Sequence, residues 1–367
     1  MFGIEMNSVQ PVIRPDMDGA THKRYVEACS ALVYGNDVTG ATAALRDKLA
    51  GYIKERAARA PYDVQAMSEI NAVLTLVVDP AILQSMELLG LMGEYHELGY
   101  GEAAEIETWK LTEGGARIQA ANGDVTYPAW EHSKVPVATS TISAGMAVDY
   151  RELALGNFDS KLPVAIQNVV TDIRNRAITL VLDRVFDRLK NNTDNVKFYT
   201  EYTGEITQTA VDKMIADMRP LGGVLSIMGD FSVISAISDW VGYKVIGNGT
   251  PTNLPFYAPE QAMQMQISGV QQYYKGAHLV ELPNPYNLTR PLDDKSGFER
   301  YYDANRTLFV PTGSASPIKI FRRGDITSLT GVDVKTGRQL TRYDLEIGAD
   351  VVKGQEYMIG AMVKTGD

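Results

Sequence analysis

A chain of 367 residues, of which 45% are hydrophobic and 22% charged, is long enough for two or three domains and can bury a sizeable core. Its formal net charge of −10 argues against a protein that mainly holds nucleic acid, because phosphate binding needs a basic surface. The single cysteine, Cys29, excludes a disulfide framework within the chain.

The sequence gives no sign of a membrane or a secretory pathway. The longest apolar run, residues 72–78, is far shorter than the run of about 18 residues that a membrane-spanning helix needs. Residues 1–5 do not begin a basic region followed by an apolar stretch, so we expect no signal peptide. We therefore expect a protein that is made and folded in a cytoplasm and contacts no membrane.

The first part of the chain is polar and irregular and then becomes helical. Residues 1–19 carry two prolines and little periodicity, which is typical of an extended arm. Residues 42–59 have a charged helical pattern that Pro61 ends. Two further helices are predicted at 63–76 and 80–91.

The segment from Ile106 to Tyr150 is expected to contain an extended β-hairpin. Asn122-Gly123 lies between two short alternating runs, and Asn-Gly in that setting is a strong signal for a hairpin turn. The hairpin is mostly polar on both faces, and a two-stranded hairpin with so little apolar surface is marginal alone. It therefore needs another molecule or domain to lie on. Residues 135–148 are predicted to return as strand.

A long amphipathic helix is predicted at about 159–190. Its apolar residues recur every three or four positions, the period of one helical face: Leu162, Ile166, Val169, Ile173, Ala177, Leu180 and Val181. Asp159 and Ser160 can cap its start, Pro163 fits the first turn, and Asn191-Asn192 can end it. At ~1.5 Å per residue this rod is about 45 Å long, the length of a structural spine.

The remaining chain alternates between helix and strand and then becomes mostly β. A helix is predicted at 207–218, a buried strand at 224–228, and a helix at 231–240 that Asp230 can cap. A strand follows at 277–281. From Thr307 onward, strands are predicted at 308–310, 318–321, 343–347 and 357–363.

No pattern of residues predicts a catalytic, cofactor or metal site. The four histidines are isolated, without a second metal ligand at helical or zinc-ribbon spacing: His22, His96, His132 and His278. Gly222-Gly223 lies between a helix and a strand, the reverse of the order in a phosphate-binding loop. Arg323-Gly324-Asp325 is expected to be a turn between two strands. We expect no enzyme activity, no cofactor and no bound metal.

The order of these elements resembles a major capsid protein of tailed bacteriophages. The resemblance covers about residues 60–367 and is carried by three segments: Tyr150-Arg151-Glu152-Leu153 through Lys161-Leu162-Pro163-Val164 into the long helix, Gly223 to Asp230 with its following helix, and Tyr302-Asp303 through Thr307-Leu308-Phe309-Val310-Pro311 to Val363-Lys364. It implies an α+β, Hong Kong 97-type capsid fold with a long spine helix, an extended β-hairpin loop, and peripheral and axial domains.

The resemblance also implies a division of the chain: 1–60 an N-terminal arm, 61–105 a helical segment, 106–150 the extended loop, 151–202 the spine helix of the peripheral domain, 203–285 the axial domain, and 286–367 a C-terminal β-rich part. The tip of the extended loop is expected to contact a neighbouring subunit through Arg117, Gln119, Asn122, Gly123 and Asp124. Some members of the family join their subunits by Lys–Asn bonds. The tip here, 113–124, has no lysine, and only Lys110 and Lys134 lie nearby, so a non-covalent shell is expected.

By this resemblance the chain is expected to assemble into an icosahedral head shell around a phage double-stranded DNA genome. Its expected partners are copies of itself in hexamers and pentamers, together with scaffolding, portal and decoration proteins. The DNA is enclosed without sequence-specific binding, and the protein belongs to the virion after assembly in the host bacterial cytoplasm. Two alternatives stay open: an encapsulin-like bacterial nanocompartment shell protein, and a cytoplasmic α/β enzyme without a recognisable motif.

Overall fold

The computed structural model describes residues 24, 27–28, 31, 39–60, 63, 65–66, 69–70, 78, 82, 86–111, 129–148, 150–155, 162–191, 195–240, 243–244, 254–255, 268–287, 299–312, 316–333 and 338–365. The chain divides into two compact units. The first unit comprises Met1–Leu88, Ser140–Ala177 and Gly324–Glu346, and the second unit comprises Leu89–Thr139, Ile178–Arg323 and Ile347–Asp367.

In the first unit, helix α3 (Gly40–Arg59) confirms the helix predicted at 42–59. Its residues Leu49, Ile53 and Ala57 recur at every fourth position and are buried, which is the pattern of one helical face against a core. The short helix α6 (Tyr150–Leu155) packs against α3.

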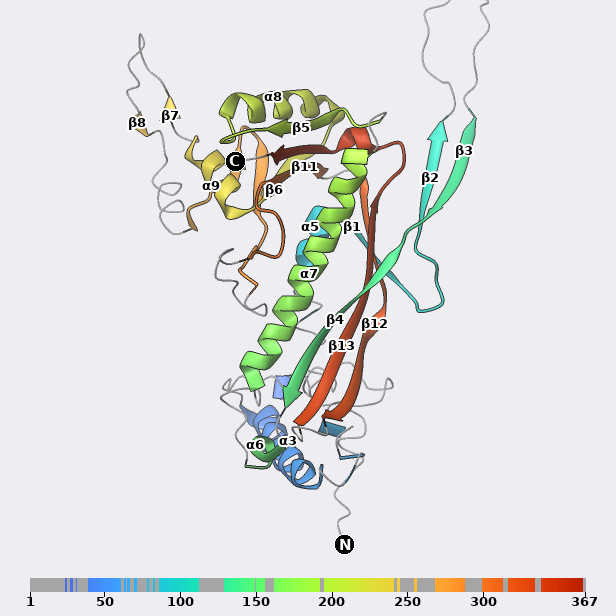
Figure 1. Cartoon of the computed structure of the whole chain (residues 1–367), viewed down its shortest axis with the longest axis vertical. Helices are drawn as coiled ribbons and strands as arrows, with labels where there is room; N and C mark the ends of the chain where they lie inside the picture. The colour runs from blue at the N-terminus through green and yellow to red at the C-terminus, as the bar shows by residue number, and fades with distance from the viewer. Residues whose placement is uncertain are drawn as a thin grey trace, which may run out of the picture. The chain divides into compact units, whose positions relative to one another are not determined.

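The long helix α7 (Leu162–Asn191) has 30 residues and confirms the predicted spine. It is the continuous light-green helix of Figure 1 and contributes residues to both units. Its buried residues follow the expected spacing: Ile166, Val169, Ile173, Ala177, Val181, Val185 and Leu189. The predicted capping residues Asp159 and Ser160 lie outside the described residues.

A four-stranded sheet has the strand order β1-β12-β13-β4. Its strands are β1 (Glu94–Leu98), β4 (Thr139–Val148), β12 (Ile318–Asp333) and β13 (Arg338–Val351). β1 runs parallel to β12, with Glu94 opposite Lys319 and Leu98 opposite Arg323. β12 and β13 are far longer than the strands predicted at 318–321 and 343–347.

The turn predicted at Arg323-Gly324-Asp325 is wrong, because these residues lie inside β12. Gly324 has a φ of 67°, a left-handed value that glycine adopts without a steric penalty. Glycine and aspartate favour turns in an isolated segment. Here β12 pairs with β1 up to Arg323 and lies next to β13 in the sheet, and the strand continues through this one irregular residue.

In the second unit, a six-stranded sheet has the order β5-β14-β11-β6-β10-β9. Its strands are β5 (Phe198–Tyr202), β6 (Val224–Gly229), β9 (Tyr273–Tyr274), β10 (Ala277–Glu281), β11 (Arg306–Thr312) and β14 (Gly360–Lys364). β6 is buried after its first residue and pairs in parallel with β10 and antiparallel with β11. The strands predicted at 224–228 and 277–281 are therefore confirmed.

Helices α8 (Gln208–Met218) and α9 (Phe231–Asp239) build the core of this unit with the sheet. Their apolar faces join sheet residues in one buried cluster that includes Val211, Met214, Ile215, Met218, Val233, Ile234, Ile237, Ile227, Leu279 and Phe309. The approach of helix and sheet is close at Gly360, where a Cβ would meet Met218 Sδ at 2.5 Å. A short 3-10 helix, η2 (Arg219–Leu221), and Gly222-Gly223 turn the chain from α8 into β6.

The sequence does not predict β1 or β5, and it assigns 61–105 to helices although β1 lies there. Helix α5 (Glu87–Met92) confirms the end of the helix predicted at 80–91, whereas most of 63–76 lies outside the described residues. The strand predicted at 357–363 begins later, because a 3-10 helix, η3 (Glu356–Met358), precedes β14.

Two further pairs complete the described strands: β2 (Glu105–Leu111) with β3 (Trp130–Pro136), and β7 (Tyr243–Lys244) with β8 (Leu254–Pro255).

Candidate functional site

The predicted hairpin is present at its base, as the two-stranded ribbon β2–β3 (Figure 1). The strands are antiparallel, from Glu105 opposite Pro136 to Leu111 opposite Trp130. The five residues predicted to contact a neighbouring subunit lie outside the described residues: Arg117, Gln119, Asn122, Gly123 and Asp124. Their role therefore stays a prediction.

A small apolar cluster anchors the base of the hairpin. Its buried members are Ala104, Ile106, Val137, Phe321 and Val352. The backbone N–H of Val137 also donates to the carbonyl of Ala104 at 2.8 Å, so both strands leave the unit from a fixed point. Beyond this point, residues 131–134 of β3 are exposed.

A group of opposite charges lies on one face of the hairpin. Lys134 Nζ is 2.5 Å from Glu107 Oε1 and 3.9 Å from Glu105 Oε2, and His132 Nε2 is 3.7 Å from Glu107 Oε2. The hydrogen bond from Lys134 and its charge lower the pKa of Glu107, and Glu107 in turn raises the pKa of Lys134. Because such exposed pairs contribute little to folding, the group chiefly fixes the charge of this face.

An apolar hollow of about 740 Å³ lies in the first unit, on the parts of β4, β12 and β13 that belong to it. Residues 143–147 of β4 contribute mainly small side chains, and Leu329 of β12 and Leu340 of β13 are 60% and 45% exposed. Arg342 stands at its rim, where Nη2 donates to Ser143 Oγ at 2.8 Å and Nε donates to Asp344 Oδ1 at 2.7 Å. Exposed apolar surface of this kind is typical of a site that binds another molecule.

In the second unit, Asp230 is buried and accepts hydrogen bonds from three residues. Its Oδ1 accepts from the backbone N and Oγ of Ser232, at 3.0 and 2.8 Å, and so caps α9 as predicted. Its Oδ2 accepts from Asn284 Nδ2 at 3.0 Å and Arg300 Nη1 at 2.7 Å. Burial acts to raise the pKa of Asp230, but these hydrogen bonds together lower it. The sequence does not reveal this second role, because Asn284 and Arg300 are distant along the chain.

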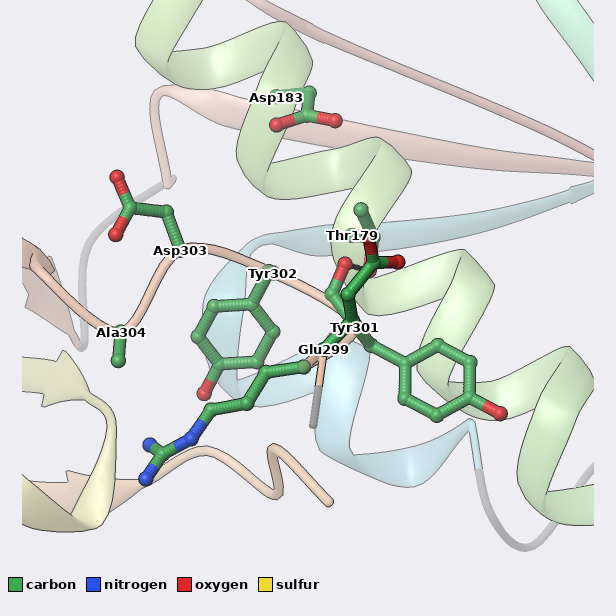
Figure 2. Close-up of a pocket in the computed structure, with 8 residues that line it drawn as sticks. Thr179, Asp183, Glu299, Tyr301, Tyr302, Asp303 and Ala304 are labelled. Atoms are coloured by element: carbon green, nitrogen blue, oxygen red, sulfur yellow. Dashed lines mark hydrogen bonds between the residues drawn. The ribbon is translucent and has the colours of Figure 1, made fainter. Parts of the chain in front are cut away.

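Arg300 and its neighbours also line a second hollow, of about 410 Å³, with Thr179 and Asp183 of α7 (Figure 2). Figure 2 shows the rings of Tyr301 and Tyr302 directed to opposite sides of their segment. Thr179 Oγ1 donates to the carbonyl of Tyr301 at 3.2 Å, and Arg306 Nη1 lies 2.5 Å from Asp183 Oδ1. These contacts tie residues 299–306 to α7, so this hollow is a structural junction.

The described histidines have neighbours that suit structural roles. His96 stacks on Phe321 with ring centroids 5.3 Å apart, and His278 lies beside Tyr273 at the same distance. His22 lies outside the described residues. Within the part of the chain that the structure describes, no group of three or more His, Cys, Asp or Glu side chains is placed to hold a metal ion, and no helix is long and apolar enough to cross a membrane.

Comparison with known proteins gives one family and several similar structures. The model of the family described as "SPbeta prophage-derived putative capsid protein YonB" matches residues 19–363. No curated protein sequence matches the chain. The mature capsid of bacteriophage PhiM1 is similar over 75% of this chain and 86% of that chain, at 11% identity and a TM-score of 0.46. The virus-like particle from Pyrococcus furiosus is similar over 78% of this chain and 97% of that chain, at 10% identity and a TM-score of 0.44. Mycobacterium phage Patience is similar over 81% of this chain and 89% of that chain, at 12% identity and a TM-score of 0.45.

Proposed function

This chain belongs to the YonB family of prophage-derived capsid proteins, and we propose that it is the major subunit of an icosahedral head shell that encloses phage double-stranded DNA. The observation that carries the proposal is the family match over residues 19–363, nearly the whole chain. The capsid protein predicted from the order of the elements is confirmed by this match, and the α+β class is confirmed by the structure.

Two features of the described residues support self-assembly. The hairpin β2–β3 is exposed beyond its base, and a two-stranded ribbon is marginal without a surface to lie on. The hollow on the four-stranded sheet exposes two leucines to solvent. We propose a Hong Kong 97-type arrangement in hexamers and pentamers, with α7 as the spine, 106–150 as the extended loop, 151–202 in the peripheral domain and 203–285 as the axial domain.

The assembled particle contains further proteins besides copies of this chain. The tip residues of the extended loop contact a neighbouring subunit, and scaffolding, portal and decoration proteins complete the particle. The net charge of −10 supports a shell that encloses DNA without sequence-specific binding. The protein is then a component of the virion, assembled in the host bacterial cytoplasm.

The two alternatives fare differently. The family match names a capsid, so an encapsulin-like nanocompartment shell is not favoured. A family of capsid proteins implies a structural role without catalysis. The alternative of a cytoplasmic enzyme is tested by the assembly experiment below.

The experiment is to purify the full chain, alone and with a co-expressed scaffold, and measure its size by light scattering and negative-stain microscopy. We expect rings or closed particles many times larger than the 40.3 kDa subunit. A chain that stays monomeric at every salt and crowding condition, with and without scaffold, contradicts the proposal.

A further inference from the structure

One arginine of the long helix is half-buried without an acidic partner. Arg174 lies in the part of α7 that belongs to the first unit. Its Nε donates to Oδ1 of the adjacent Asn175 at 3.2 Å. Among the residues that the structure describes, no carboxylate lies within ion-pair distance of its guanidinium. The charge of Arg174 is therefore not neutralised within this part of the subunit.

The helix around Arg174 explains why no acidic side chain reaches it. Residues three and four positions apart are neighbours on a helix surface. For Arg174 these neighbours are all uncharged: Val170, Thr171, Ala177 and Ile178. Ala177 and Ile178 are fully buried, and Asn175 is 1% exposed, so the guanidinium stands beside a closed part of the helix surface. Burial lowers the pKa of Arg174 accordingly.

Other partly buried arginines of the described residues have a carboxylate partner. Arg56 Nε lies 2.9 Å from Glu69 Oε2, and Arg322 Nη2 lies 3.0 Å from Glu97 Oε1. A cation that is partly removed from water costs free energy unless an acceptor or an anion compensates it. The amide oxygen beside Arg174 satisfies only one of the several N–H donors of a guanidinium. The environment of Arg174 is thus that of an anion site that lacks its anion.

Two anions are at hand in a shell that encloses DNA: carboxylates of neighbouring copies and phosphates of the duplex. A carboxylate on a flexible side chain can enter a half-buried position and accept two parallel hydrogen bonds from a guanidinium. Duplex phosphates bind where several exposed cations lie together. Arg176, two positions away, faces a different side of the helix. With 45 acidic against 35 basic residues, each copy also has carboxylates in excess. These observations favour a carboxylate.

We propose that the guanidinium of Arg174 binds a carboxylate side chain of a second copy of this chain when the subunits assemble. The inference rests on the proposed function and deepens it by naming a charged contact between copies. The pair forms in a partly desolvated position, where a hydrogen-bonded ion pair is stronger than at an exposed surface. The subunit alone leaves this position incomplete, and assembly completes it.

The first test removes the charge and keeps most of the apolar stem of the side chain. We expect Arg174→Met to raise the protein concentration needed for assembly of DNA-free protein by about tenfold or more, because the partner carboxylate is then left unpaired in the contact. Arg184→Met makes the same change at an exposed position of the same helix. This control should assemble like the unchanged chain.

The melting temperature of the unassembled subunit separates a contact between copies from one within a copy. Arg174→Met should melt at the same temperature as the unchanged chain or higher, because the charge has no partner to lose. A lower melting temperature overturns the inference, since Arg174 then stabilises its own subunit.

The assembly measurements distinguish the remaining outcomes. If Arg174→Met assembles as well as the unchanged chain, the inference fails while the proposed function stands. If its particles differ only in weaker binding of a duplex DNA fragment, the anion is a phosphate and the inference is again overturned. If the unchanged chain never assembles, the proposed function itself fails, and the inference with it.

A cross-linking experiment identifies the partner directly. Arg174→Lys places an amine at the same position, and a water-soluble carbodiimide joins an amine to a touching carboxylate by taking up the water that is lost. Copies labelled with heavy nitrogen are mixed with unlabelled copies before assembly and cross-linking. Mass spectrometry should find the peptide that contains position 174 joined to an Asp or Glu peptide of the other label. Cross-links within one label only, or the same yield from Arg184→Lys, overturn the inference.

Discussion

The carboxylate of Asp230 joins two segments of the second unit that its position in the sequence does not connect. As the cap of α9 it satisfies a backbone N–H at the start of that helix, where a partial positive charge favours an anion. It also accepts hydrogen bonds from Asn284 and Arg300, which lie 54 and 70 positions farther along the chain. Because the side chain of Asp230 is only 3% exposed, water cannot replace the carboxylate as the acceptor of these hydrogen bonds if the charge is lost.

We therefore expect Asp230→Asn to lower the free energy of unfolding by about 1.5–3 kcal/mol, the range for hydrogen bonds to a charged group. Urea denaturation of the unassembled subunit measures the change. Asp239→Asn, at an exposed position near the end of the same helix, is the matched control and should stay within about 0.5 kcal/mol. Equal effects of the two substitutions would contradict the assigned role.

The same carboxylate gives a pH dependence. Burial opposes ionisation of Asp230, but the hydrogen bonds from Ser232, Arg300 and Asn284 leave its folded pKa below the ordinary value. The stabilisation is thus present above the unfolded pKa of about 3.9 and is lost as the pH falls through the folded pKa. Below about pH 4, stability should fall less steeply in Asp230→Asn than in the unchanged chain.

Gly324 provides a second test at the scale of one residue. Its φ of 67° is strained for any L side chain, so Gly324→Ala should destabilise the subunit by about 1–2 kcal/mol in urea denaturation. Gly331→Ala, in the same strand, is the control, because a Cβ there meets no atom within 4 Å and its φ lies outside the left-handed range. If both substitutions are neutral, β12 does not need the irregular residue.

Helices were predictable from local patterns, whereas the long strands were not. α7, α8 and α9 each repeat apolar residues at helical spacing and carry their boundary signals within a few residues. β12 contains Arg-Gly-Asp and a Thr-Ser pair, which have no strand pattern of their own, and its length depends on pairing with β1 and β13. The short edge strands β1 and β5 likewise depend on partners far along the chain.

The buried face of α7 should tolerate no charge. Ile173 is fully buried, and an unpaired buried carboxylate costs several kcal/mol against a total stability of about 5–15 kcal/mol. Ile173→Asp should therefore abolish the cooperative thermal transition. Val164→Asp, at a residue of the same helix that is 58% exposed, should melt close to the unchanged chain. A normal melt for Ile173→Asp would show that the helix packs by another face.

The tip of the hairpin should be dispensable for folding and necessary for assembly. The base is held by its own apolar cluster at Ile106 and Val137, so removal of residues 115–124 leaves the anchor in place. We expect an unchanged melting temperature and no particles by light scattering. A collapse of the melting temperature would instead assign the tip to the core of the subunit.

At the scale of the whole molecule, the chain offers two different surfaces for contact with other copies. The hairpin carries the exposed charges of Glu107 and Lys134, and the first unit has an apolar hollow with Arg342 at its rim. Where the two surfaces of a contact between identical copies differ, the copies bind head to tail, and a ring closes when the rotation between copies completes a circle. A shell built in this way holds together through many modest contacts, so no single contact has to be tight.

The last prediction is that these contacts remain non-covalent. A Lys–Asn bond needs a neutral lysine amine, and the predicted tip, 113–124, contains Arg117 and no lysine. Of the two nearby lysines, Lys134 is engaged by Glu107, which raises its pKa and keeps the amine protonated. Lys110 lies opposite Glu131 in the register.

Particles boiled in detergent should therefore run as a single band near 40.3 kDa. A ladder of covalent oligomers would contradict the prediction, and comparison of Lys110→Arg with Lys134→Arg would then identify the reacting amine. Because Glu107 keeps Lys134 protonated in the unassembled subunit, a Lys134 bond would require assembly to break that ion pair and bury the amine. The ladder would then appear only after particles form, whereas disordered aggregates of the same chain would still dissolve to one band.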